Sequence, residues 1–213
     1  MSNHDVRRHV SRWTRPGDDP RAVAKLAILI LVSLRGMICL YEGEELGLPE
    51  AELRFDQLRD PYGIRFWPAF KGRDGCRTPM PWEHDRPHGG FTTGTPWLPV
   101  PDAHLELAVD RQEAGPDSVL HAYRAALALR RAHPALARGD LVFLDGPDGL
   151  LAFEREHGNE AILCLFNLSD REIRWHLPRP HRPEPAILSA GGFERTGDTV
   201  RLAPLGHALL AVA

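Results

Sequence analysis

One short loop holds the side chains of this sequence that are most able to bind a polar ligand. Residues 72–83 contain two arginines, an aspartate and a tryptophan, together with Pro79 and Pro81. Neither a helix nor a strand fits, because each proline lacks a backbone N–H and pushes the preceding residue toward extended geometry. Guanidinium groups donate to hydroxyls or carboxylates, and tryptophan covers an apolar face. The loop is therefore either a polar-ligand site or a proline-braced surface turn with solvated arginines.

The same loop resembles a signature of the α-glucosidases of glycoside hydrolase family 13, the α-amylase family. The pattern Gly-Arg-Asp-x-x-Arg-Thr-Pro-Met-x-Trp runs from Gly72 to Trp82. Flanking segments match as well: Asp60–Gly63, Phe66–Pro68, Gly90–Thr92 and Pro96–Val100. The resemblance is specific because the match is long and keeps its order along the chain.

The resemblance implies roles for individual residues. Asn3-His4-Asp5 resembles the loop after the seventh barrel strand, where the family keeps a His-Asp pair. In the family this aspartate hydrogen-bonds sugar hydroxyls and favours the distorted, oxocarbenium-like state of the sugar. Asp5 is therefore expected to stabilise the transition state. His4 is expected to hydrogen-bond the sugar in the first subsite, and Arg73 or Arg77 to line the same pocket. Taken alone, His4 would be an ordinary polar loop histidine.

The family's chemistry needs two further carboxyl groups. Retaining hydrolysis uses a nucleophile and an acid about 5–5.5 Å apart, and the family supplies both from the fourth and fifth barrel strands. Those motifs are absent from this sequence. The chain is therefore expected to be a carboxyl-terminal fragment of an enzyme for maltose- or isomaltose-like oligosaccharides. It is expected to be inactive until a complementing amino-terminal barrel fragment is supplied.

Several elements would position these residues. Asp19-Pro20 predicts the start of a helix over Pro20–Leu34, apolar almost all round. Met37–Tyr41 is predicted as a buried strand, and the resemblance makes it the eighth of the barrel. The acidic residues 42–45 that follow are either the edge of an active site or a solvated turn.

The remaining barrel-like part is predicted with less regular structure. Residues 1–19 are expected to be loop, and residues 46–116 to contain at most one short helix. A further helix is predicted from Asp117 or Ser118 to Arg131, ended by Pro134. The resemblance makes these segments the last two β/α units of a (β/α)8 TIM barrel.

From Gly139 the pattern changes to short strand-like runs separated by glycine and proline turns, which indicates an antiparallel β-sandwich. We therefore predict two domains, a partial catalytic barrel at 1–138 and a β-sandwich at 139–213. The expected strands are Leu141–Leu144, Leu150–Glu156, Ala161–Phe166, Glu172–Leu177, Ala186–Leu188, Val200–Leu202 and Ala208–Val212.

A second hypothesis is a non-catalytic carbohydrate-binding or interaction module built on the sandwich. Exposed aromatic side chains would support it, because aromatic rings stack on sugar faces. The region offers only Trp175 and no tyrosine, so the fragment hypothesis is preferred.

Composition limits the other possibilities. The chain has 213 residues, 43% of them hydrophobic and 26% charged, which is ordinary for a soluble globular protein. A net charge of −3 gives no indication of a nucleic acid or membrane partner. The three cysteines are far apart, which fits reduced thiols in the cytoplasm rather than a disulfide framework. No metal or cofactor motif is present, and no cofactor is expected.

Overall fold

The structure is a computed structural model that describes residues 1–178 and 186–212. It contains two compact units. The first comprises Met1–Lys25 with Cys39–Arg124, and the second comprises Leu26–Ile38 with Ala125–Ala213. The helices α2 (Pro20–Ser33) and α6 (Val119–Ala132) each begin in the first unit and end in the second.

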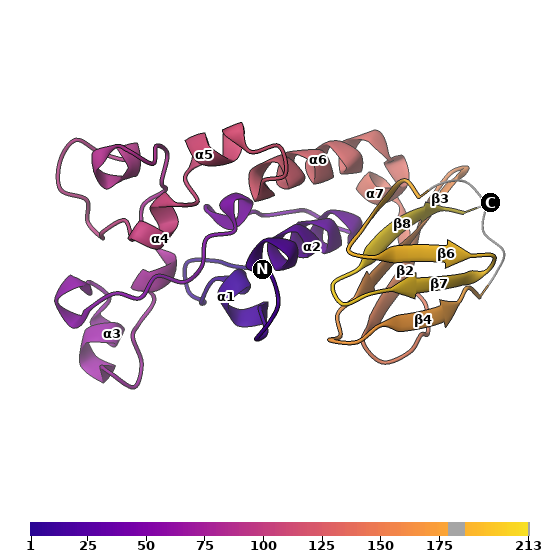
Figure 1. Cartoon of the computed structure of the whole chain (residues 1–213), viewed down its shortest axis with the longest axis horizontal. Coiled ribbons are helices and arrows are strands. Elements are labelled where there is room, and N and C mark those ends of the chain that lie inside the picture. Colours follow the sequence, from indigo (N-terminus) through magenta and orange to yellow (C-terminus); the bar gives the residue numbers. More distant parts are fainter. Residues whose placement is uncertain (179–185, 213) are drawn as a thin grey trace. The chain divides into compact units, whose positions relative to one another are not determined.

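The first unit is built from short helices joined by ordered loops (Figure 1). The prediction that residues 1–19 are loop was wrong at α1 (His9–Trp13), and residues 46–116 hold more than one helix. The helices within residues 46–116 have only four to six residues, and a helical period cannot be recognised in so short a segment because the pattern is read over 11–18 residues. They are α3 (Pro61–Phe66), α4 (Asp102–Leu105) and α5 (Val109–Ala114), with 3₁₀ turns at Glu44–Leu46, Phe55–Gln57, Asp74–Cys76 and Pro87–Gly90.

The two longer helices confirm their predicted positions, and capping side chains explain where they start. Asp19 Oδ1 accepts the Arg21 N–H at 2.9 Å, and Ser118 Oγ accepts the His121 N–H at 3.2 Å. Each bond satisfies one of the amide donors that have no partner in a first helical turn. The α6 helix ends at Ala132, and Pro134 then starts α7 (Pro134–Arg138).

The strand predicted at Met37–Tyr41 does not form. The segment lies outside every assigned strand, Met37 is 98% exposed and Cys39 is exposed. A strand must pair its N–H and C=O groups with a neighbour, and no part of the described chain pairs with this one. An apolar run indicates a tendency to be buried, but it does not supply the neighbouring strand.

The second unit contains the predicted antiparallel sandwich (Figure 1). One sheet has the order β1 (Asp140–Phe143), β2 (Leu150–His157), β3 (Glu160–Asn167), β8 (His207–Ala211) and β5 (Leu188–Ala190). The other has the order β4 (Ile173–His176), β7 (Thr199–Leu202) and β6 (Phe193–Thr196). Strand β6 was not predicted because Phe193 is its only apolar residue, and β5 begins where the predicted run Ala186–Leu188 ends.

Both sheets contribute to the sandwich core. Leu163 and Leu165 of β3 pack with Val200 and Leu202 of β7, and all four are fully buried. The spacing of two follows from the alternation of side chains along a strand. Trp175 packs against the same cluster, so it is not an exposed platform for a sugar ring.

Two arginine side chains of the second unit cap the carboxyl-terminal end of α2. Arg130 donates to the carbonyl oxygens of Val32, Leu34 and Gly36 at 2.5, 2.8 and 2.7 Å. Arg155, which is fully buried, donates to the carbonyls of Ser33 and Gly139. The last carbonyls of a helix have no partner inside it, so these side chains supply the missing donors.

Candidate functional site

A tight turn near the amino terminus presents His4 and Asp5. Asn3 and Val6 form an isolated antiparallel bridge around it, and Asn3 Oδ1 accepts the Asp5 N–H at 2.8 Å. Asn and Asp side chains commonly stabilise turns in this way. His4 Nε2 lies 3.1 Å from Asp5 Oδ2, and the two side chains are 69% and 50% exposed. The turn is therefore held by the Asn3–Val6 bridge and the Asn3 side chain, while the His4 and Asp5 side chains stay accessible.

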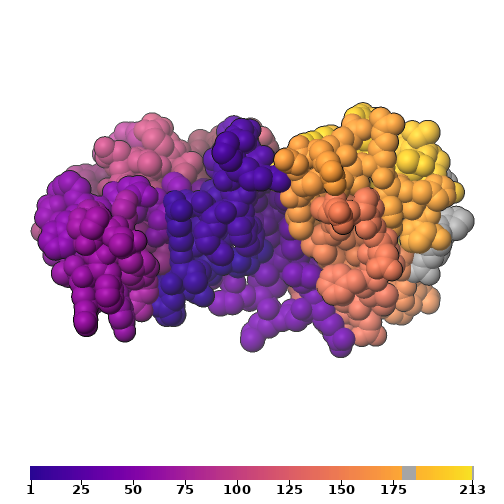
Figure 2. All heavy atoms as spheres, turned by 90° about the horizontal axis from the view of Figure 1, so that it is seen from below, coloured from indigo at the N-terminus to yellow at the C-terminus, as the bar shows by residue number. Residues whose placement is uncertain are grey.

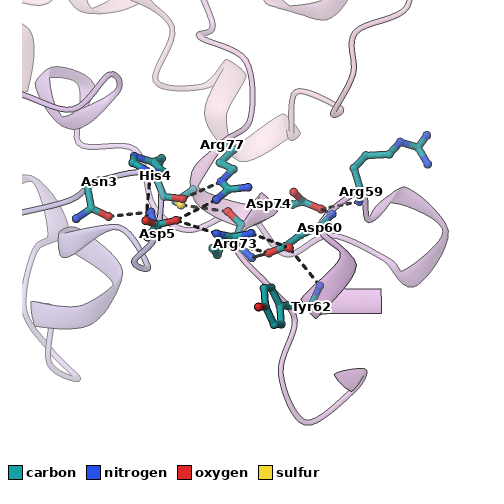
Figure 3. Close-up of polar contacts among 10 residues, drawn as sticks. Asn3, His4, Asp5, Arg59, Asp60, Tyr62, Arg73, Asp74 and Arg77 are labelled. Atoms are coloured by element: carbon teal, nitrogen blue, oxygen red, sulfur yellow. Dashed lines mark hydrogen bonds and ion pairs between the residues drawn. The ribbon is translucent and has the colours of Figure 1, made fainter. Parts of the chain in front are cut away.

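Both arginines of the signature loop reach this turn (Figure 3). Arg73 Nη1 and Arg77 Nη2 lie 3.0 and 3.2 Å from the same atom, Asp5 Oδ1. Arg77 Nε also donates to the His4 carbonyl at 2.7 Å. The structure thus brings His4, Asp5, Arg73 and Arg77 together, although about 70 positions separate the two pairs in sequence.

A buried carboxylate, Asp60, lies behind Arg73 (Figure 3). Arg73 donates to it through Nε at 2.9 Å, Nη2 at 3.1 Å and its backbone N–H at 2.8 Å. These bonds lower the pKa of Asp60 to about 2, and the same pairing raises the pKa of Arg73. Asp60 Oδ1 also caps α3 by accepting the Tyr62 N–H at 3.2 Å. Asp60 was not among the predicted site residues, although it begins one of the matched segments.

A second buried carboxylate, Asp74, holds the backbone around Asp60. Its Oδ2 accepts the N–H groups of Arg59 and Asp60 at 2.6 and 2.7 Å. The loop folds back closely here, because a Cβ on Gly63 would lie 2.6 Å from the Lys71 carbonyl oxygen. Gly72 has φ +79°, which disfavours any residue with a side chain. These contacts fix the backbone that carries Arg73.

Asp5 and Arg73 line a cavity of about 450 Å³, and Arg77 is not among its lining residues. The wall combines apolar side chains with charged ones: Leu53, Leu58, Pro68, Ala69, Phe70, Arg7, Glu50, Glu52 and Lys71. Pockets of this size and mixed polarity suit small polar ligands. The other two carboxylates have partners of their own, since Glu50 accepts the Arg8 N–H and Glu52 pairs with Lys71.

Two of the acidic residues, Glu42 and Glu44, anchor the amino-terminal segment, and Glu44 is buried rather than solvated. Glu44 is 2% exposed and accepts the Ser2 N–H, with His9 Nδ1 3.3 Å away. Burial raises the pKa of Glu44, but the hydrogen bonds from His9 and Ser2 outweigh it and lower the pKa overall. Arg8, also buried, bonds the side chain and the carbonyl of Glu42 at 2.9 and 2.7 Å.

These anchors hold the amino-terminal segment, in indigo, at the surface of the first unit (Figure 2). The three cysteines are free, as predicted. Across residues 1–178 and 186–212, no helix combines the length and apolar character needed to span a bilayer.

Comparison with known proteins identifies the family. The α-amylase catalytic domain matches residues 1–139, and the carboxyl-terminal domain of maltogenic amylases matches residues 141–208. The chain therefore belongs to the α-amylase family. The end of a catalytic barrel followed by a β-sandwich is confirmed at the level of these domains, although the strand at Met37–Tyr41 is not formed.

The similar proteins include α-glucosidases. A probable α-glucosidase of Rhizobium meliloti (strain 1021) is 56% identical over 91% of this chain, which covers 34% of that relative. An oligo-1,6-glucosidase of Heyndrickxia coagulans is 32% identical over 98% of the chain and 40% of the relative. The crystal structure of an α-glucosyl transfer enzyme, XgtA, superposes with a TM-score of 0.91 at 45% identity, covering 100% of this chain and 39% of XgtA. The chain thus spans between a third and two fifths of the length of these proteins.

Proposed function

We propose that this chain forms the carboxyl-terminal part of a retaining α-glucosidase that cleaves the α-glucosidic bonds of short oligosaccharides. The observation that carries the proposal is the placement of Asp5. Its carboxylate lines a cavity beside Arg73, and its Oδ1 receives bonds from two guanidinium groups. A negative charge in this position stabilises the positive charge that develops on a sugar ring during cleavage.

Each residue has a role in this proposal. Asp5 stabilises the oxocarbenium-like transition state, and His4 hydrogen-bonds the sugar in the first subsite. Arg73 forms part of the pocket wall and orients Asp5. Arg77 fixes the turn, because it bonds both the His4 carbonyl and the Asp5 carboxylate.

The nucleophile and the general acid come from a complementing amino-terminal part of the catalytic domain. Glu50 and Glu52 do not replace them, because one accepts a backbone N–H and the other pairs with Lys71. We therefore propose that the chain alone does not hydrolyse glucosides. We also propose that its two domains divide near residue 138 and that the protein works in the cytoplasm. A carbohydrate-binding module built on the sandwich has less support, since Trp175 packs against the core.

The test is reconstitution. The purified chain should release no more aryl aglycone from an aryl α-glucoside than a protein-free blank. Adding the amino-terminal part of the catalytic domain from the Rhizobium meliloti relative should give turnover, and Asp5→Asn should lower it by about a hundredfold to a thousandfold. Turnover by the chain alone, or full activity of the reconstituted Asp5→Asn variant, would contradict the proposal.

A further inference from the structure

We propose that Asp60, with its backbone held by Asp74, is a positioning residue that aims the Arg73 guanidinium at Asp5. The geometry of the three side chains supports this directly. The kinetic consequence rests on the function proposed above.

The first argument is the direction of the bonds. Asp60 takes the Nε and Nη2 donors of Arg73, and this leaves Nη1 to bond Asp5 at 3.0 Å (Figure 3). A guanidinium group is planar and rigid, so fixing one edge determines where the other edge points. Asp60 thereby decides where the donor to Asp5 lies.

The second argument is burial. The Asp60 side chain is fully buried, whereas that of Asp5 is 50% exposed. A buried carboxylate needs a charged partner and hydrogen bonds. The contact of Arg73 with Asp60 is therefore the stronger constraint on its guanidinium, and the contact with Asp5 depends on it. Asp74 completes the arrangement, since its Oδ2 holds the amides of Arg59 and Asp60.

The chain contains a matched control for this arrangement. Asp56 receives Arg54 Nε and Nη2 at 3.1 and 3.0 Å, the same two donors that Asp60 receives from Arg73. Asp56 and Arg54 are 68% and 71% exposed, and neither lines the cavity. Replacing Asp56 therefore removes a similar ion pair without touching Asp5.

The decisive variant is Asp60→Asn in the full chain. Asparagine is as good a helix cap as aspartate, so α3 keeps its cap while the charge is lost. We expect the Arg73 Nε–H signal in ¹H–¹⁵N spectra to move to the position of a free arginine and to exchange with water at least about tenfold faster. The backbone amide of Asp5 should shift as well, whereas Asp56→Asn should change neither signal.

The second measurement uses the reconstituted enzyme. Asp60→Asn should lower kcat by about a hundredfold, because a misplacement of about 1 Å has effects of that size. KM should change by less than about threefold, as for a group that acts in the transition state. If reconstitution gives no turnover, the proposed function fails, and the spectra still decide the positioning role.

The proposal is overturned if the Arg73 signal of Asp60→Asn matches that of the unchanged chain, or if Asp56→Asn has the same effect. Should Asp60→Asn not fold, Arg73→Lys takes its place. A single ammonium cannot bridge Asp60 and Asp5 as a guanidinium does, so the Asp5 amide should shift. An unchanged Asp5 amide in that variant would equally overturn the proposal.

Discussion

Two pairs of arginine side chains, one pair in each unit of this protein, make different contacts. In the second unit, Arg130 and Arg155 donate to backbone carbonyls at the end of α2. In the first unit, Arg73 and Arg77 donate to the carboxylate of Asp5, which lines a cavity. All four side chains have their hydrogen bonds, but their acceptors differ in how firmly the fold holds them.

The difference lies in how firmly the fold holds the acceptor. A backbone carbonyl at a helix end is placed by the helix itself, and an arginine that bonds it becomes part of the fold. A half-exposed carboxylate on a short turn can rearrange its bonds when a ligand arrives. We expect substitution of Arg130 or Arg155 to reduce stability and substitution of Arg73 or Arg77 to affect the site.

Arg155→Ala should have the largest effect on stability. It leaves the buried carbonyls of Ser33 and Gly139 without a donor, which costs about 1–3 kcal/mol for each group. We expect the free energy of unfolding of the second unit to fall by about 3 kcal/mol in urea denaturation. The control is Arg174→Ala, an exposed side chain whose loss should cost under about 0.5 kcal/mol. Equal midpoints for the two variants would remove the distinction.

Asp60 should make stability depend on pH in the acid range. Its pKa is about 2 in the folded chain against an ordinary 3.8, so its contribution is complete above about pH 4 and is lost as the pH falls through 2. The shift corresponds to about 2 kcal/mol. Asp60→Asn should therefore be less stable than the unchanged chain at pH 6, and the two should converge near pH 2. A difference that stays constant from pH 6 to pH 2 would contradict this, and Asp56→Asn serves as the exposed comparison.

Arg77→Ala should reduce the local order of the turn at residues 3–6 while leaving the overall stability of the chain nearly unchanged. The side chain bonds the His4 carbonyl and the Asp5 carboxylate at an exposed turn, so its loss should cost less than about 1 kcal/mol. Hydrogen exchange of the amides in residues 3–6 should nevertheless accelerate, because the turn loses its clamp. Unchanged exchange in this turn would show that Asn3 alone is sufficient to hold it.

Asp5→Asn should have the smallest effect on stability, within about 0.5 kcal/mol, because it removes one charge from exposed ion pairs. Denaturant midpoints of the variant and the unchanged chain should agree within that limit. A loss comparable to that of Arg155→Ala would mean that Asp5 belongs to the scaffold, and the comparison between the two units would no longer hold.

The parts of the fold that were predicted correctly carry local signals. Asp19 and Ser118 are capping side chains at the starts of α2 and α6, and glycine and proline turns separate most strands of the sandwich. The features that were missed lack such signals. The α1 helix has only five residues, and β6 is mostly polar. The apolar run at Met37–Tyr41 has a signal but finds no partner strand in the described chain.

The sequence by itself indicated the family and the change from helices to a β-sandwich near residue 139, and it singled out His4, Asp5, Arg73 and Arg77, which the structure places in contact. It could do so because motifs, caps and turns are written in neighbouring residues. Only the tertiary structure decided that Asp60 holds Arg73, that Arg77 binds the turn, and that Glu44 is buried against His9. Those contacts join residues 13 to 73 positions apart in the chain or depend on burial. They form only when loops without a regular period fold back on one another, and no short stretch of sequence specifies that.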